Sequence, residues 1–197
     1  DKRPATFYID FDYTYNANDA NEFGEYEFSD AVTGVSLAEE VQFWKNNPSV
    51  FRTIYRSSQA ELEANSYTSL SFGFEQAIHI DRTLLYFFND YTSRTYNDAV
   101  SEVLNTNILT NRVDVMMPTL YTWFNPTVYI SHVSTSYPEN DARGTPTLFT
   151  YGANINRPVG KKLYLTIDYS FSSQKADKLE SDEFDGQLFS INLDYVY

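Results

Sequence analysis

The chain has 197 residues, a formal net charge of −13 and no cysteine, and 17% of its residues are aromatic. Its length predicts a single domain over residues 1–197. The absence of cysteine excludes disulfide scaffolds, thiolate metal sites and thiol nucleophiles, and the negative charge argues against nucleic acid as a partner. No run of about 18 apolar residues is present, so the sequence also excludes a transmembrane helix.

The first segment, residues 6–15, alternates large apolar residues with mostly polar ones. In an extended chain Phe7, Ile9 and Phe11 fall on one face, whereas Asp10 and Asp12 fall on the other. A period of two predicts a β-strand with one apolar and one polar face.

Residues 16–66 break this alternation and favour a helical insert. Residues 36–39 have the pattern of a capping box at a helix N-terminus, and Asn47-Pro48 is typical of a second helix start. Two apolar stripes at helical spacing follow these signals. They consist of Leu37, Val41 and Trp44, and of Phe51 and Tyr55. The alternative is that residues 40–44 and 51–55 form two additional strands, which raises the number of strands to ten.

Alternation returns after this segment and continues to the end of the chain. The strands expected there are residues 66–80, 83–95, 112–124, 127–137, 147–157, 162–173 and 187–197. Long loops (16–66, 96–111, 138–146 and 174–186) alternate with short turns (81–82, 125–126 and 158–161). This layout predicts an all-β fold, an eight-stranded antiparallel up-and-down transmembrane β-barrel with a helical insert in the first long loop.

The last strand has the clearest alternation, with Phe189, Ile191, Leu193, Tyr195 and a final Tyr197 on one face. This stretch resembles the closing strand of small bacterial outer-membrane β-barrels, in which an aromatic residue commonly ends the chain. The resemblance implies a location in the bacterial outer membrane among its lipids, with both termini in the periplasm. The first residues show no basic-then-apolar leader, so we expect that a leader has been removed or that the sequence is part of a longer chain.

The polar residues of the strands distinguish a membrane barrel from a soluble one. They are mostly Asp, Ser, Thr, Asn and Gly, which are compact enough to fill a narrow interior, whereas a solvent-facing surface is expected to carry Lys and Glu. A soluble barrel or sandwich with an apolar interior is the alternative. The long loops hold most of the acidic residues, so the rim that they form is strongly acidic.

Several charged residues are expected to point into the barrel. They are Asp10, Asp12, Glu75, Asp90, Arg94, Asp114, Asp168 and Asp194. Because eight strands leave an interior only just wide enough for side chains, we expect a salt-bridged interior, with Arg94, Arg112 and Lys162 as the basic partners. A lumen that prefers cations is the alternative. No cofactor or metal site is expected, because the acidic residues of 177–185 lack the ligand spacing of a calcium loop.

His132 and Ser134 are the candidates for catalysis. They are two residues apart, so on a strand they share a face, and the imidazole could activate the hydroxyl. The pair is similar to the His-x-Ser motif of outer-membrane lipid A deacylases, which implies a lipid hydrolase. Thr135 stands where that family has asparagine, and residues 147–157 contain no carboxylate to orient the histidine.

The sequence therefore favours a non-enzymatic envelope scaffold or interaction module that acts through acidic extracellular loops. The apolar residues of the insert (Leu37, Val41, Trp44, Phe51 and Tyr55) are the candidates for binding a protein partner at the long-loop rim. One alternative function is a barrel component of an exporter or porin-like assembly, in which the chain joins partner chains around a wider lumen. The lipid hydrolase that uses His132 and Ser134 is the other alternative.

Overall fold

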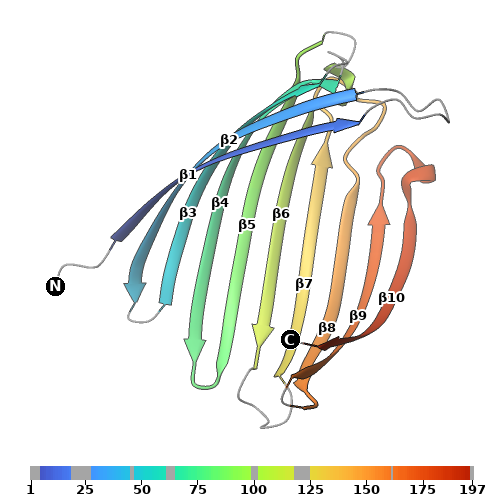
Figure 1. Cartoon of the computed structure of the whole chain (residues 1–197). Helices are drawn as coiled ribbons and strands as arrows, with labels where there is room; N and C mark the ends of the chain where they lie inside the picture. Colours follow the sequence, from blue (N-terminus) through green and yellow to red (C-terminus); the bar gives the residue numbers. More distant parts are fainter. Residues whose placement is uncertain are drawn as a thin grey trace.

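The computed structural model describes residues 5–18, 28–44, 47–60, 65–98, 102–117, 125–160 and 162–195. These residues form one antiparallel sheet of ten strands in the order of the chain (Figure 1). The strands are β1 (Ala5–Asn18), β2 (Phe28–Trp44), β3 (Asn47–Ala60), β4 (Tyr67–Ile80), β5 (Thr83–Tyr96), β6 (Thr106–Met116), β7 (Asn125–Ser136), β8 (Thr147–Pro158), β9 (Leu163–Lys175) and β10 (Phe184–Tyr195). Two short 3₁₀ helices, Glu102–Leu104 and Glu180–Asp182, lie in connections.

Each strand pairs with its neighbour in the sequence, so the sheet is a meander with β1 and β10 at its edges. The sheet is curved (Figure 1). Among the described residues no ladder joins β1 to β10, and the sheet is therefore not closed into a barrel.

The structure contradicts the predicted eight-stranded barrel with a helical insert. Residues 28–44 and 47–60 form the paired strands β2 and β3, in which Leu37 lies opposite Thr53. The alternative reading was correct in the number of strands, although not in closure. The helical interpretation failed because Leu37 and Val41, like Phe51 and Tyr55, are four residues apart. A spacing of four places side chains on one face of a helix and also on one face of a strand.

The predicted strand boundaries are accurate at the tight turn of residues 81–82. Residues 66–80 and 83–95 correspond closely to β4 and β5, which are joined at Asp81 and Arg82. Asp81 has a φ of 54°, a left-handed conformation that aspartate tolerates better than most residues. The strand predicted at 112–124 is wrong, because β6 begins at Thr106 and ends at Met116; residues 118–124 lie outside the described part.

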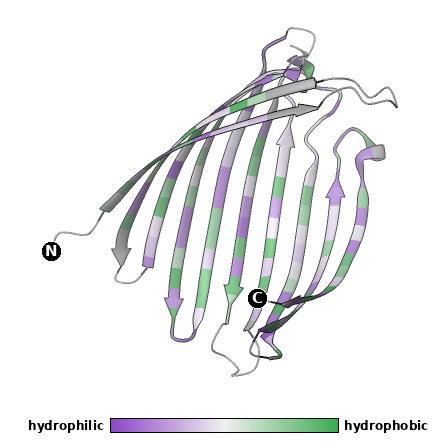
Figure 2. Cartoon of the chain, in the orientation of Figure 1, coloured by the Kyte–Doolittle hydropathy of each residue, from purple (hydrophilic) through white to green (hydrophobic). Residues whose placement is uncertain are grey.

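Hydrophobic and hydrophilic residues alternate along much of the central strands (Figure 2), and successive residues of a strand point to opposite faces of the sheet. In the described part of the chain no hydrophobic side chain is buried. The buried side chains are polar: Ser49, Ser58, Ser66, Ser69, Ser71, Gln76, Asn105 and Asp114. The usual arrangement of an apolar core under a polar surface is inverted.

Candidate functional site

One face of the sheet, called the apolar face below, carries the large hydrophobic side chains. Residues directly opposite each other in an antiparallel pair share a face, and the register joins Phe11, Val35 and Tyr55 across β1–β3. Near the other edge Ile167 and Ile191 are paired across β9 and β10. Phe11 is 77% exposed and Ile191 is 60% exposed. In the described structure this face has no second layer packed against it.

The large apolar side chains of this face form a band, called the apolar band below. It crosses the sheet at an angle to the rows of paired residues. The row that contains Phe11 continues through Leu70 of β4 to Ser93 and Asn107 of β5 and β6, where it is polar. On β8–β10 the band lies closer to the short connections, in the row that contains Ile191. The strands are therefore inclined relative to the band.

A short polar ladder interrupts this band on β5–β7, with Phe74 and Phe149 at its two ends. Asn89, Asn111 and His132 lie opposite one another on β5, β6 and β7. The Asn89 side-chain amide donates a hydrogen bond to Asn111 Oδ1 at 2.5 Å. Because Asn89 is paired with Phe74, the ladder belongs to the apolar face.

His132 and Ser134 lie on this same face, and they do not form an assembled catalytic group. Both residues are described, as are the nearby carboxylates Glu139 and Asp141, and the structure gives no hydrogen bond between any two of these four side chains. A general base must come within about 2.6–3.2 Å of the hydroxyl that it activates. The hydrolase alternative therefore depends on the sequence pattern alone.

The opposite face, called the polar face, carries all eight charged residues expected to point inward. The register places Asp10, Asp12, Glu75, Asp90, Arg94, Asp114, Asp168 and Asp194 there. The residues on the central strands contact one another or neighbouring polar groups. Those on β1 and β10 lie at the edges of the sheet and stay apart from them.

A charged cluster occupies the middle of the polar face. Arg52 Nη2 lies 2.7 Å from Glu75 Oε1, and the Tyr86 hydroxyl donates a hydrogen bond to the other oxygen of the same carboxylate. Glu75 is mostly shielded from solvent, so the arginine and the tyrosine together compensate a carboxylate that is costly to leave alone. Arg52 was not among the basic partners expected for the carboxylates, because residues 16–66 were assigned to a helical insert.

A second ion pair lies beside this cluster on β6. Arg112 Nε is 2.8 Å from Asp114 Oδ1, and the Arg112 guanidinium lies 4.6 Å from the ring centre of Tyr129 on β7. The ring of Tyr129 extends over Gly152 of β8, where an added Cβ would lie 2.6 Å from the ring. Glycine at this position therefore allows the aromatic ring to lie flat on the sheet.

The other polar-face residues have partial networks. Arg94 stacks on Tyr67 at 4.5 Å, but its buried Nε and the Thr106 hydroxyl have no hydrogen-bond partner among the described residues. Asp168 accepts a hydrogen bond from the Asn154 side chain, and Thr92 donates to Asp90 at 2.9 Å.

Two connections at the long-loop rim are tied to each other. Asp177 Oδ1, between β9 and β10, accepts a hydrogen bond from the Thr145 backbone N–H, between β7 and β8, at 2.6 Å. Lys178 Nζ donates to the carbonyl of Asp141, also at 2.6 Å. Gly144 has a φ of 65°, and a Cβ there would lie 1.9 Å from Asp177 Oδ1. Glycine is thus required at position 144 both by the backbone and by the contact.

A polar pocket of about 300 Å³ lies beneath these tied connections, and Arg143 is part of its lining. The Arg143 guanidinium lies 4.4 Å from the ring centre of Tyr137, and the Gln174 side-chain amide donates to the Asp182 carbonyl at 2.6 Å. Glu139, Asp141 and the other carboxylates around the pocket are mostly exposed.

The apolar residues proposed to bind a partner lie within the sheet. Leu37, Val41, Phe51 and Tyr55 are on the apolar face of β2 and β3, and Leu37 is 50% exposed. Trp44 ends β2, and its side chain lies outside the described part. The first four residues belong to the apolar band and do not extend from a helical insert above the rim.

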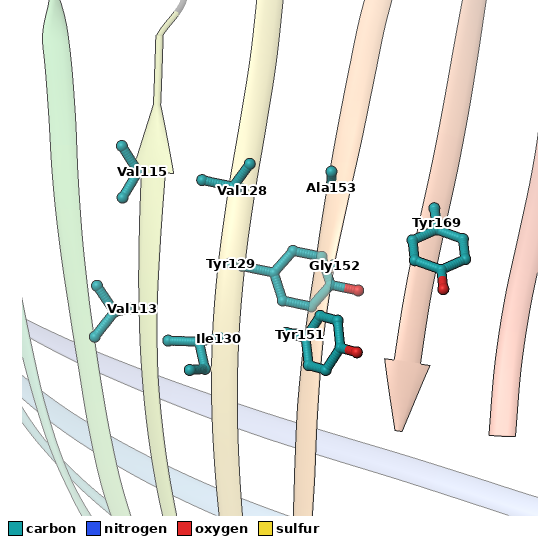
Figure 3. A pocket seen from close by; sticks show the side chains of 9 residues that line it. All are labelled: Val113, Val115, Val128, Tyr129, Ile130, Tyr151, Gly152, Ala153 and Tyr169. Atoms are coloured by element: carbon teal, nitrogen blue, oxygen red, sulfur yellow. The ribbon is translucent and has the colours of Figure 1, made fainter. Parts of the chain in front are cut away.

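The apolar face contains two shallow depressions. One, of about 540 Å³, lies over β1–β4 around Leu37 and Phe51. The other, of about 440 Å³, lies over β6–β9. Figure 3 shows its lining, in which valine and isoleucine side chains of β6 and β7 lie beside Tyr151 and Tyr169.

Comparisons with known proteins do not place the chain in a family: no protein-family model matches it, and no curated protein matches it. In the described residues, no helix has the length and apolar character needed to span a membrane. The same residues contain no group of three or more His, Asp and Glu side chains arranged to hold a metal ion.

Proposed function

We propose that the chain is a β-sheet protein of the bacterial outer membrane, with both termini in the periplasm, that acts as an envelope scaffold or interaction module. The observation that carries this proposal is the inverted burial of the described residues. Polar side chains fill the protected positions, and large apolar side chains are exposed on the apolar face of every strand from β1 to β10.

An apolar face of this extent needs an apolar solvent. Monomeric soluble proteins rarely expose contiguous apolar patches larger than a few hundred Å². Lipid hydrocarbon would solvate the apolar face without any change in the fold. The strands have 11 to 17 residues, and about 9–11 residues suffice for a tilted strand to cross a bilayer.

The slant of the apolar band supports the same placement. Strands in transmembrane sheets are tilted by about 35–45°. A band that is level with the bilayer must then cross the pairing rows at an angle. The shift from Phe11 on β1 toward Ile191 on β10 has this form.

The tied connections at the long-loop rim are the proposed binding surface. The hydrogen bonds of Asp177 and Lys178 hold the two connections together, so their exposed carboxylates form a preorganised acidic surface. Preorganisation lowers the entropy lost on binding. A partner with a basic surface would be attracted to this rim, and the attraction should weaken as salt is added.

Fluorescence quenching by lipid tests the membrane placement. The chain has no cysteine, so a single introduced cysteine can carry an environment-sensitive dye. Tyr169 and Ser170 are neighbours on β9 that face opposite sides. We expect brominated lipids to quench a dye at Tyr169→Cys several-fold more than a dye at Ser170→Cys. Equal quenching at the two positions would contradict the proposal.

The open edges of the sheet favour a second candidate function, a barrel component of an exporter or porin-like assembly. Within the described chain, the outer sides of β1 and β10 have no strand beside them. A sheet of this kind can join further strands to enclose a lumen lined by the polar face.

Conductance in planar bilayers separates the two candidate functions. An assembly that encloses a lumen is expected to give discrete, reproducible current steps, whereas a scaffold without a lumen leaves the bilayer silent. Heat-denatured protein at the same concentration is the control for nonspecific leakage.

A further inference from the structure

The two free edges of the sheet are complementary to each other in one register. β1 is paired only with β2, and β10 is paired only with β9, in the part of the chain that the structure describes. Unpaired edge strands offer rows of free N–H and C=O groups, and such groups are not tolerated in hydrocarbon. If the membrane placement proposed above holds, both edges must be covered.

We propose that a second copy of this chain covers them, with β1 of one copy antiparallel to β10 of the other. Each copy supplies one edge of each kind, so two identical junctions close the pair and leave no free edge. Eight strands are enough to close a barrel, so a shortage of strands is not the reason that the sheet of one chain is open. The curved sheet of one chain (Figure 1) then contributes ten strands to a shared wall.

The apolar faces of the two edges fix the register. The apolar stretch of β1 is centred on Phe11 and that of β10 lies around Ile191 and Leu193, and the two stretches overlap when Phe11 lies opposite Ile191. The same register places Ile9 opposite Leu193 and Tyr13 opposite Phe189. Ile9, Phe11, Phe189, Ile191 and Leu193 are each at least 60% exposed in the single chain. Cross-strand pairs of large apolar side chains stabilise a sheet.

The polar faces agree with this register. It places Tyr8 opposite Asp194, Asp10 opposite Asn192 and Asp12 opposite Ser190, so that each carboxylate meets a hydrogen-bond donor. The described structure gives the side chains of Asp10, Asp12 and Asp194 no hydrogen bond or ion pair with any described residue. The edge carboxylates are therefore available to a neighbouring strand.

Registers shifted by two residues are worse. A shift in one direction places Asp10 opposite Asp194, and like charges directly opposite each other destabilise a strand pair. A shift in the other direction places Asp12 opposite Leu188 and Tyr13 opposite Gln187. A shift by one residue would turn every apolar side chain of the second copy to the polar face. The side chains thus select a single register.

Disulfide trapping between single-cysteine variants tests the pairing between copies. Protein with Ile9→Cys is mixed with protein with Leu193→Cys before reconstitution, and Asp10→Cys is mixed with Asn192→Cys in parallel. Neighbouring pairs alternate between close and wide spacing, so one of the two mixtures brings the sulfur atoms within reach of a disulfide. We expect a dimer-sized product at least tenfold above that from Ile9→Cys mixed with Gln187→Cys.

Several outcomes would overturn the proposal. These are the absence of the dimer-sized product from both mixtures, or equal yields in the misaligned control. A further one is a disulfide confined to a single chain in the Ile9→Cys/Leu193→Cys double variant, because it would show that the chain pairs its own edges. Lipid quenching of a dye at Tyr169→Cys, in a separate preparation reconstituted in the same way, separates this failure from a failure of the membrane placement.

A charge exchange gives a second test without cysteine. Asn192→Asp places a carboxylate opposite Asp10, and we expect at least a twofold loss of dimer in analytical ultracentrifugation in detergent. Adding Asp10→Asn to the same chain should restore the dimer, since one carboxylate again faces one amide. Loss without restoration would assign the effect to the fold of β10 and would count against the register.

Discussion

At the scale of single residues, the packing of this sheet depends on where side chains are missing. Gly34 leaves room for the Asp12 carboxylate, and Gly152 leaves room for the ring of Tyr129. At Gly152 an added Cβ would also lie 2.6 Å from the Tyr169 backbone carbonyl oxygen, which cannot move without breaking the ladder. The position therefore excludes even the smallest side chain.

We expect Gly152→Ala to lower the free energy of unfolding by about 1–3 kcal/mol, the usual cost of overpacking. Gly186→Ala is the matched control, because Gly186 also lies in a strand and an added Cβ there has its nearest neighbour at 4.0 Å. Urea unfolding in detergent micelles measures both variants. Equal midpoints for the two variants would show that the sheet adjusts around Tyr129.

The sequence identified which residues share the polar face but not which of them touch. Alternation alone places Glu75, Asp90 and Asp114 together on one face. The pairing of Glu75 with Arg52 and Tyr86 requires the register between β3, β4 and β5, which a single sequence does not show. Arg112 was among the partners expected for the carboxylates, whereas Arg52 was hidden in a segment assigned to a helix.

At the scale of elements, the strands were predictable where both faces obey the alternation. Residues 66–80 mostly do so and match β4. Residues 83–95 match β5 although residues 84–88 are apolar on both faces, because the turn at residues 81–82 marks where that strand begins. β2 carries Glu39 on its apolar face, between Leu37 and Val41, and this carboxylate breaks the alternation. The remaining pairs at a spacing of four then favoured a helix. Only pairing with β1 and β3 decides between the two structures.

The tied connections of the long-loop rim predict a change in proteolysis. Asp177→Ala removes the acceptor of the Thr145 N–H, and we expect trypsin to cleave after Arg143 and Lys178 at least fivefold faster, because local opening exposes both sites. Asp185→Ala is the control, since the structure gives its exposed carboxylate no contact with the connection that contains Thr145. Unchanged cleavage rates would show that Asp177 does not hold the connections together.

At the scale of the whole molecule, the apolar band predicts that the cost of introducing a charge on the apolar face depends on its depth in the bilayer. Phe72 lies within the band on β4, whereas Thr95 lies on the same face near the long-loop end of β5. In a bilayer, we expect Phe72→Arg to cost about 2–4 kcal/mol and Thr95→Arg about 0–1 kcal/mol, the values for the midplane and the interface. Reversible unfolding in lipid vesicles measures both, and similar costs at the two positions would argue against a bilayer around this face.

The open sheet was not predictable from the alternation of loops and turns. An even number of strands with long and short connections in turn fits a closed barrel and an open meander equally, because closure depends on one pair of edges. Nothing in residues 5–18 or 184–195 marks those strands as lacking a partner. The register proposed between β1 of one copy and β10 of another depends on knowing which face of the sheet each side chain occupies.

The inverted burial also determines when this chain is able to fold. Water drives most proteins to collapse by expelling apolar side chains into an interior, but here the native state keeps Phe11, Phe72 and Ile191 on the outside. Collapse in water would therefore bury the wrong residues. On the proposed membrane placement, the chain is therefore expected to acquire this structure only after it has reached the bilayer.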